Sequence, residues 1–139
     1  MKSIVVAMLI LIISSEATAS GEPLPRVSHY SFEIGFDLAT QRLSSNVTMV
    51  VINSTTQSVT ELPFLLYRLL RLERVTSSSG DSLPFTQSVL ALPDEPQLQA
   101  NAILVQLEKP IRPGDSACIV MRYGGYIFGY PEVMAYVKD

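Results

Sequence analysis

The sequence has almost none of the residues that build metal sites and nucleophilic sites. Its 139 residues include one histidine, His29, one cysteine, Cys118, and no tryptophan. One imidazole and one thiolate cannot supply the three or four ligands that zinc takes from His and Cys, and no disulfide can form within the chain. The motifs His-Glu-x-x-His and Gly-x-Ser-x-Gly and a glycine-rich phosphate loop are all missing. Composition leaves a Ser-His-Asp arrangement open, but nothing in the sequence places one beside His29. We therefore predict no catalytic, cofactor-binding or metal-binding residue in this chain.

The sequence also lacks a concentration of positive charge. Ten Lys and Arg residues stand against thirteen Asp and Glu residues, which gives a formal net charge of −3, and the basic residues are scattered along the chain. Nucleic-acid binding requires a basic stripe that neutralises phosphates. Nucleic acid is therefore excluded as a predicted partner.

The N-terminus has the pattern of a secretory signal peptide. Lys2 precedes an unbroken apolar run at residues 4–13, and a small-x-small site follows at Ala17 and Ala19. An uncleaved membrane anchor would need roughly 20 apolar residues, about twice the length of this run. We predict a signal peptide at residues 1–19, export to a periplasmic or extracellular location, and contact with a membrane only during export. The remainder has the length of one domain.

Alternation of apolar and polar residues predicts strands through most of that domain. Residues 29–38 place apolar side chains at every second position, which indicates a strand with one polar face. A turn at 39–42 and a β-branched segment at 46–53 predict a hairpin. Residues 59–72 fit both a helix and a strand, and Pro63 favours a single strand. A weaker extended segment follows at 83–92.

The later part of the chain predicts a second hairpin. Residues 102–107 are apolar at nearly every position, Pro113 and Gly114 form a turn, and residues 117–123 make the next strand, which Gly124 and Gly125 interrupt. The predicted fold over 20–130 is therefore all-β, an antiparallel β-sandwich or saddle-like sheet. Pro131 followed by glutamate is typical of a helix start, so residues 131–139 are predicted to be a short C-terminal helical start or a link to a missing domain.

Several side chains with chemical potential are better explained by structure. His29, Glu33 and Asp37 share the polar face of the first strand, but each interval of four residues spans about 13 Å, too far for an acid–base pair. Cys118 lies in an apolar strand and is predicted to be a buried small hydrophobe. Asn46 and Asn53 each begin a glycosylation triplet, which matters only in a eukaryotic secretory pathway.

Aromatic residues gather near the C-terminus, at Tyr123, Tyr126, Phe128 and Tyr130. Such a cluster can serve as a platform for a sugar or a peptide. Packing in a core or at a domain interface is the commoner use of aromatic side chains.

Read in order, the segments resemble the N-terminal β domain of the M1 family of zinc aminopeptidases, which are gluzincins. The similarity is carried by residues 30–38, 46–53 and 70–75, and best by 102–114 together with 119–125, where a proline-containing turn ending in glycine separates two strands and the second ends in Tyr-x-Gly. It covers residues 30–128. The family's His-Glu-x-x-His, its downstream glutamate and its Gly-x-Met-Glu-Asn-type motif are absent, so the catalytic domain is missing.

The resemblance implies a non-catalytic domain of an exported M1-like zinc metallo-aminopeptidase that supports the catalytic domain and helps wall the peptide cavity. The chain alone would not be an enzyme, and zinc would belong to the catalytic domain of the parent protein, which would be missing here or a separate chain. The alternative is a freestanding secreted β-sandwich binding module. The first hypothesis predicts a domain interface at the C-terminus, formed by Tyr126, Phe128, Tyr130, Val133, Met134 and Val137.

Overall fold

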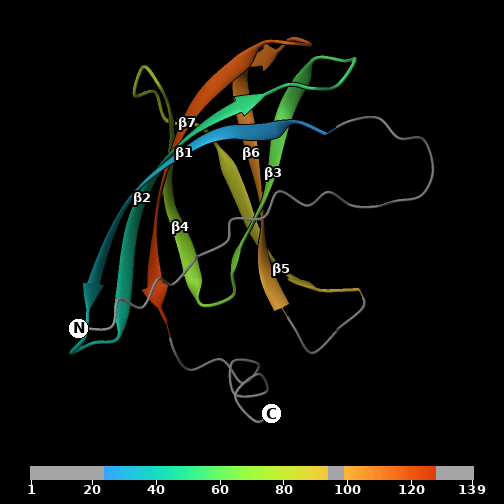
Figure 1. The fold of residues 1–139 in the computed structure, drawn as a ribbon. Coiled ribbons are helices and arrows are strands. Elements are labelled where there is room, and N and C mark those ends of the chain that lie inside the picture. The colour runs from blue at the N-terminus through green and yellow to red at the C-terminus, as the bar shows by residue number, and fades with distance from the viewer. Residues whose placement is uncertain (1–23, 94–98, 128–139) are drawn as a thin grey trace.

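The described chain is a two-layer antiparallel β structure. The computed structural model describes residues 24–93 and 99–127. Its strands are β1 (Arg26–Asp37), β2 (Arg42–Ile52), β3 (Val59–Tyr67), β4 (Leu70–Ser77), β5 (Phe85–Ala91), β6 (Gln99–Ile111) and β7 (Ser116–Tyr126) (Figure 1). One sheet has the order β1-β2-β7-β4 and the other β3-β6-β5. The predicted all-β sandwich is confirmed, and the predicted helical start at 131–139 lies outside the described residues.

The first predicted hairpin is confirmed. β1 and β2 pair from Arg26 opposite Ile52 to Asp37 opposite Arg42. The Asp37 carboxylate accepts hydrogen bonds from the backbone N–H groups of Ala39 at 2.9 Å and Thr40 at 3.3 Å. An aspartate that binds the backbone two and three residues later is a common way to stabilise a tight turn.

The prediction of one strand across residues 59–72 is wrong. The segment forms β3 and then β4, separated by a turn at Arg68 and Leu69, and these two strands belong to different sheets. The leucines of this segment fit both a helical and a strand period, so their pattern did not indicate the turn between the two strands. Each strand keeps its own alternation, so Leu66 and Leu70 are both buried in the same core.

The predicted second hairpin is also wrong, although its turn at Pro113 and Gly114 is present. β6 pairs with β3 and β5, whereas β7 pairs with β2 and β4, so the connection crosses between the sheets. Asn53, just after β2, holds this crossing: its N–H donates to the Asp115 carbonyl and its carbonyl accepts from the Gly114 N–H, both at 2.9 Å. β6 and β7 do not pair directly, and the hydrogen bonds between Asn53 and the β6–β7 turn hold their connection in place.

The two glycines do not interrupt β7, which runs through to Tyr126. A Cβ added at Gly125 would lie 2.1 Å from the carbonyl oxygen of Leu69. The strand passes directly against the β3–β4 turn at this position. Glycine is needed because only a residue without a side chain allows so close an approach of two backbones.

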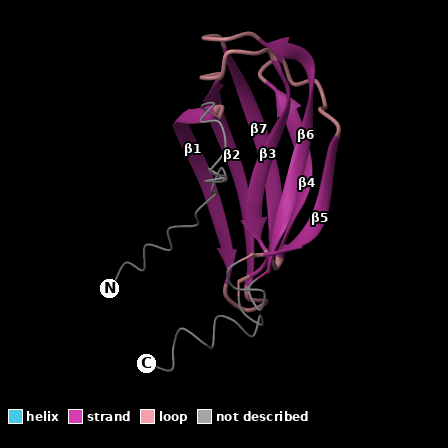
Figure 2. Cartoon of the chain, turned by 90° about the vertical axis from the view of Figure 1, so that its right-hand side faces the viewer, coloured by secondary structure: helices cyan, strands magenta, loops and turns pink. Residues whose placement is uncertain are grey.

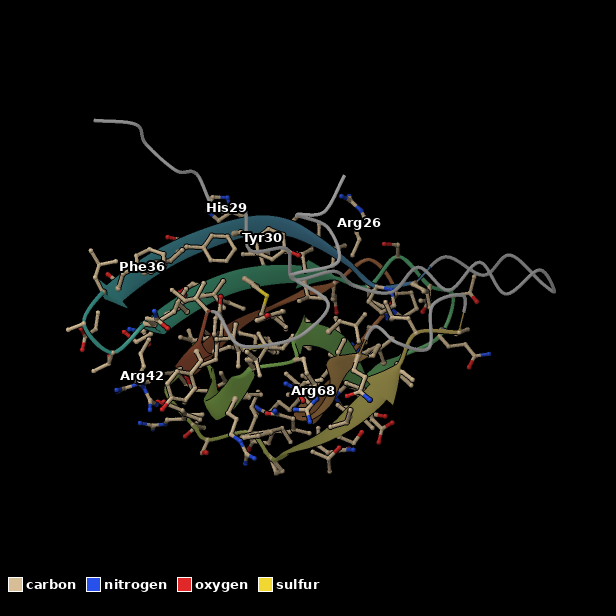
Figure 3. The ribbon with its side chains drawn as sticks, turned by 90° about the horizontal axis from the view of Figure 1, so that it is seen from below. Arg26, His29, Tyr30, Phe36, Arg42 and Arg68 are labelled. Atoms are coloured by element: carbon tan, nitrogen blue, oxygen red, sulfur yellow. The ribbon has the colours of Figure 1, made fainter. Side chains whose placement is uncertain are left out.

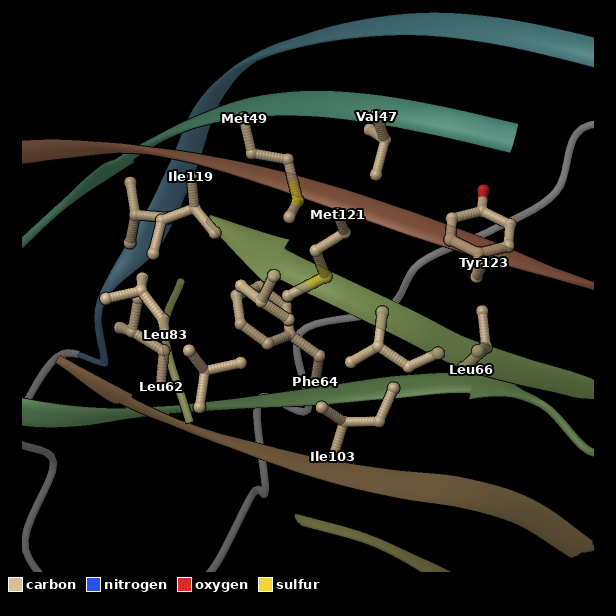
Figure 4. Packing of buried hydrophobic residues seen from close by; sticks show 14 of the residues in the cluster. Val47, Met49, Leu62, Phe64, Leu66, Leu83, Ile103, Ile119, Met121 and Tyr123 are labelled. Atoms are coloured by element: carbon tan, nitrogen blue, oxygen red, sulfur yellow. The ribbon is translucent and has the colours of Figure 1, made fainter. Parts of the chain in front are cut away.

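The core fills the space between the two sheets. Figure 4 shows Met49, Ile119, Met121 and Tyr123 extending from one sheet toward Leu62, Phe64, Leu66 and Ile103 of the other. Each fully buried side chain of this size contributes about 1.5–3 kcal/mol relative to an exposed one. The strand axes of the two sheets are roughly aligned with one another, which is the aligned form of sheet packing (Figure 2).

Candidate interaction surface

The inner face of β1 carries apolar side chains that the second sheet only partly covers. Tyr30, Phe32, Ile34 and Phe36, here called the β1 apolar row, lie opposite Met49, Val47, Ser45 and Leu43 of β2. Residues opposite one another in an antiparallel pair share a face of the sheet, so the row points to the core side. The residues of β2 are buried, but Phe32 and Ile34 are 41% exposed and Phe36 is 50% exposed. The row is therefore an apolar surface at the margin of the sandwich.

Local packing holds part of this row in place. The rings of Tyr30 and Phe32 are stacked, with their centroids 5.6 Å apart. Tyr30 is half-buried against the core, and this burial raises the pKa of its phenol. Figure 3 shows Tyr30 and Phe36 along β1, which runs along one margin of the molecule. The alternation that predicted the strand correctly identified the core face, but not that the row is half uncovered.

A second apolar opening lies beside β3. A groove of about 290 Å³ is lined mainly by apolar side chains that precede β1 or belong to β2 and β3, among them Leu24, Val51, Leu62 and Phe64. Leu24 is 42% exposed at its rim. Such a groove has the size and the lining to hold one apolar side chain of a partner.

The polar face of β1 has the character predicted for it. His29, Glu33 and Asp37 are all exposed and follow one another along the outer face of the strand. Hydrogen bonds from the side chain and backbone of Thr40, with one from the Ala39 backbone, hold the pKa of the Asp37 carboxyl below its usual value. Within residues 24–93 and 99–127, no three His, Cys, Asp or Glu side chains lie close enough together to hold a metal ion.

The C-terminal aromatic residues divide between the core and the surface. Tyr123 is 1% exposed and lies in the core, whereas Tyr126 is 49% exposed, with the Arg42 guanidinium 5.0 Å from its ring centroid. The Ile127 N–H donates to the Gln41 carbonyl at 3.2 Å, so β7 ends beside the β1–β2 turn. Tyr126 is thus the one predicted interface residue that the structure describes. Phe128, Tyr130, Val133, Met134 and Val137 lie outside the described residues.

Tyr123 brings a hydroxyl into the apolar core. Ser45 lies directly opposite on β2, and both residues are almost fully buried. Burial raises the pKa of the Tyr123 phenol, and the nearby Ser45 hydroxyl opposes this rise in part. Neither hydroxyl meets the geometry of a full hydrogen bond with any described group. Burial of these two hydroxyls therefore lowers the stability of the core.

The two glycosylation triplets have opposite environments. Asn46 is exposed on the outer face of β2, whereas Asn53 is completely buried. The Asn53 side-chain amide donates to the carbonyls of Gln57 and Ile111, both at 2.7 Å. Because a glycan would be attached to this same nitrogen, the folded domain has no room for one at Asn53. Cys118 was predicted to be a buried small hydrophobe, but it is only partly buried, because the outer face of β7 lies next to solvent.

Comparison with known proteins rests on structure alone. No protein-family model matches the sequence, and no curated protein is significantly similar to it. Among solved structures, an M1 zinc metallopeptidase from Deinococcus radiodurans aligns with 76% of this chain at 21% sequence identity and a TM-score of 0.54. A mutant of the M1 zinc metallopeptidase from that organism bound to a Tyr-Ser-Ala substrate aligns with 73% at 20% identity and a TM-score of 0.55. The chain has the fold of one part of the M1 zinc metallopeptidases.

This match confirms the predicted resemblance at the level of the fold. A two-domain M1 zinc metallopeptidase mutant bound to L-tryptophan is similar over 76% of this chain, with a TM-score of 0.56 and 20% identity. In all three cases the chain spans about a fifth of the larger protein, 20% or 21% of its length. The matched part agrees with an N-terminal β domain. In the part of the chain that the structure describes, no helix is long and apolar enough to span a membrane.

Proposed function

We propose that this chain is the non-catalytic N-terminal β domain of an exported M1-like zinc aminopeptidase, which supports the catalytic domain and helps wall the peptide cavity. The observation that carries the proposal is the fold, which matches about a fifth of M1 zinc metallopeptidases across three quarters of this chain. A domain of that kind contributes surface, while a zinc ion in the catalytic domain activates the water that attacks the peptide bond. Export is supported by the signal-peptide pattern of residues 1–19.

The C-terminal end of β7 is the proposed side of contact with the catalytic domain. Tyr126 is half-exposed there and lies on the outer face of the sheet, in line with Arg42 and Asp37. Phe36 ends the β1 apolar row at the same end of the sheet, but on the core face. A large, half-exposed amphipathic ring is a typical interface anchor. The residues that follow, from Phe128 to Val137, continue the proposed interface.

The first experiment is to sequence the source DNA beyond the codon for Asp139. A continuation, or an adjacent reading frame, with His-Glu-x-x-His and a Gly-x-Met-Glu-Asn-like motif supports the proposal and supplies the catalytic domain for a binding assay. Mixing that domain with this chain should then give a complex in size-exclusion chromatography, and Tyr126→Asp should weaken it at least tenfold. Val89→Asp, at an equally exposed position on β5, is the control and should bind normally. Unchanged binding by both variants would show that Tyr126 is not part of the interface.

A freestanding binding module is the second candidate, favoured by the apolar groove beside β3 and by the continuous buried core that the two sheets form between them. This function predicts a ligand whose apolar group enters the groove. If no peptidase sequence lies near the gene, and Leu24→Glu or Val59→Glu abolishes binding of a ligand found by screening while the variant stays folded, this second function replaces the first.

A further inference from the structure

In the part of the chain that the structure describes, β1 is a long sheet edge whose one register irregularity lies near its start, between Val27 and His29. Among the described strands the edges are β1 and β4 in one sheet and β3 and β5 in the other. β3 carries Pro63, which cannot donate a hydrogen bond to an added strand. β4 is capped from the opposite sheet, since the Gln87 side chain accepts from the Leu72 N–H at 2.9 Å and donates to the Leu70 carbonyl at 3.3 Å.

By contrast, β1 contains neither proline nor lysine in its 12 residues. β5 also contains neither proline nor lysine, but it has only 7 residues. Natural sheets block exposed edges because a row of unpaired N–H and C=O groups recruits another strand. The free edge of β1 is also continuous with the half-exposed β1 apolar row, so an added strand would gain both hydrogen bonds and apolar burial.

The sequence of β1 is complementary to itself when two copies run antiparallel. If Glu33 lies opposite Glu33 of a second copy, Phe32 faces Ile34 and Tyr30 faces Phe36, so every member of the β1 apolar row meets an apolar residue. The same register places His29 opposite Asp37 at both ends of the pairing. It uses residues 29–37, which pair with β2 without interruption, because the irregularity of β1 lies between Val27 and His29.

One unfavourable contact remains, between the two Glu33 carboxylates at the centre. Both lie on the exposed outer face, where water and salt screen the repulsion between like charges. Four cross-strand apolar pairs, by contrast, each favour the pairing and together remove half-exposed apolar side chains from water. The apolar pairs therefore outweigh the repulsion.

We propose that two copies of this chain associate through β1, which pairs antiparallel with β1 of the second copy and joins the two four-stranded sheets into one. The inference does not depend on the proposed function, because it requires the edge of β1, whereas the proposed contact with a catalytic domain is centred on Tyr126 at the end of β7. It identifies the occupant of the β1 apolar row as a second copy of the chain.

The test is the molar mass of the full chain, measured by light scattering during size-exclusion chromatography over a range of concentrations. We expect a dimer that dissociates on dilution. Ile34→Lys should raise the dissociation constant at least tenfold, whereas Val89→Lys, on the edge strand β5, should leave it unchanged. Circular dichroism and the melting temperature establish that both variants fold. A folded wild-type chain that stays monomeric, or a dimer equally stable with Ile34→Lys, overturns the proposal.

Two further variants test the register. Glu33→Gln should tighten the dimer, because it removes the like-charge contact. In a Cys118→Ser background, Glu33→Cys should form a disulfide-linked dimer on mild oxidation, since opposite residues in an antiparallel pair are about 4.5–5.5 Å apart between Cα atoms, within the range of a disulfide. Ser31→Cys should not, because residue 31 faces Gly35. If Ser31→Cys forms a disulfide-linked dimer and Glu33→Cys does not, this register is excluded.

Discussion

Asn53 is the residue whose replacement should most clearly destabilise this domain without changing the size of the core. It is completely buried at the end of β2. Its amide nitrogen donates to the carbonyls of Gln57 and Ile111, both at 2.7 Å. Its amide oxygen accepts from the Thr55 N–H at 2.9 Å and from the Thr55 hydroxyl at 2.7 Å. The side chain therefore ties the end of β2 to the following loop and to the end of β6.

Asn53→Ala removes all four hydrogen bonds and leaves their partners behind. An unsatisfied buried polar group costs about 1–3 kcal/mol. The Ile111 carbonyl contact is buried, whereas Thr55 and Gln57 can partly reach water. We therefore expect a loss of roughly 3–5 kcal/mol, a large share of the 5–15 kcal/mol typical of a whole domain. Asn53→Asp keeps the acceptor but turns a donor into a carboxylate oxygen facing two carbonyls, so it should be at least as damaging.

Urea unfolding followed by circular dichroism measures this loss as a lower midpoint with an unchanged slope. Asn46→Ala, at an exposed position on β2, is the matched control and should change stability by no more than about 0.5 kcal/mol. If Asn53→Ala costs less than about 1 kcal/mol, or no more than the control, the Asn53 hydrogen bonds do not hold the two sheets together.

Other predictions address the core hydroxyl, the close backbone approach and glycosylation. Tyr123→Phe should leave stability at neutral pH within about 1 kcal/mol of wild type or raise it, because it removes an unsatisfied hydroxyl. Because the pKa of Tyr123 is raised in the folded state, the neutral phenol favours folding below the unfolded pKa near 10, and this contribution to stability is lost as the pH rises above that value. Tyr123→Phe should therefore reduce unfolding in alkali. Thermal melts at increasing pH measure this effect. Gly125→Ala should lower the melting temperature far more than Gly80→Ala, which also has a positive φ but has no atom within 4 Å of the added Cβ; equal losses would contradict the close approach. Secreted from a eukaryotic cell, the folded protein should carry a glycan at Asn46 only, and mass spectrometry that finds one at Asn53 would disprove the buried network.

The strands and the turns between them were largely readable from the sequence. The alternation from Tyr30 to Phe36 predicted β1 and its core face, and the β-branched segment after Arg42 predicted its partner. These features are local, because a strand with one face in the core needs a period of two and a tight turn needs particular residues. The same reasoning excluded a histidine or cysteine metal site from the counts of those residues alone.

Which strands pair, and what covers them, depended on contacts between distant residues. β6 and β7 follow one another through a good turn yet enter different sheets, because β7 is taken up between β2 and β4. The sequence could not show that the β1 apolar row is half-exposed and not covered. It also could not show that Asn53 is buried and not an exposed glycosylation site. Alternation states which side chains share a face; whether a second sheet covers that face is decided only when residues far apart in the chain pack together.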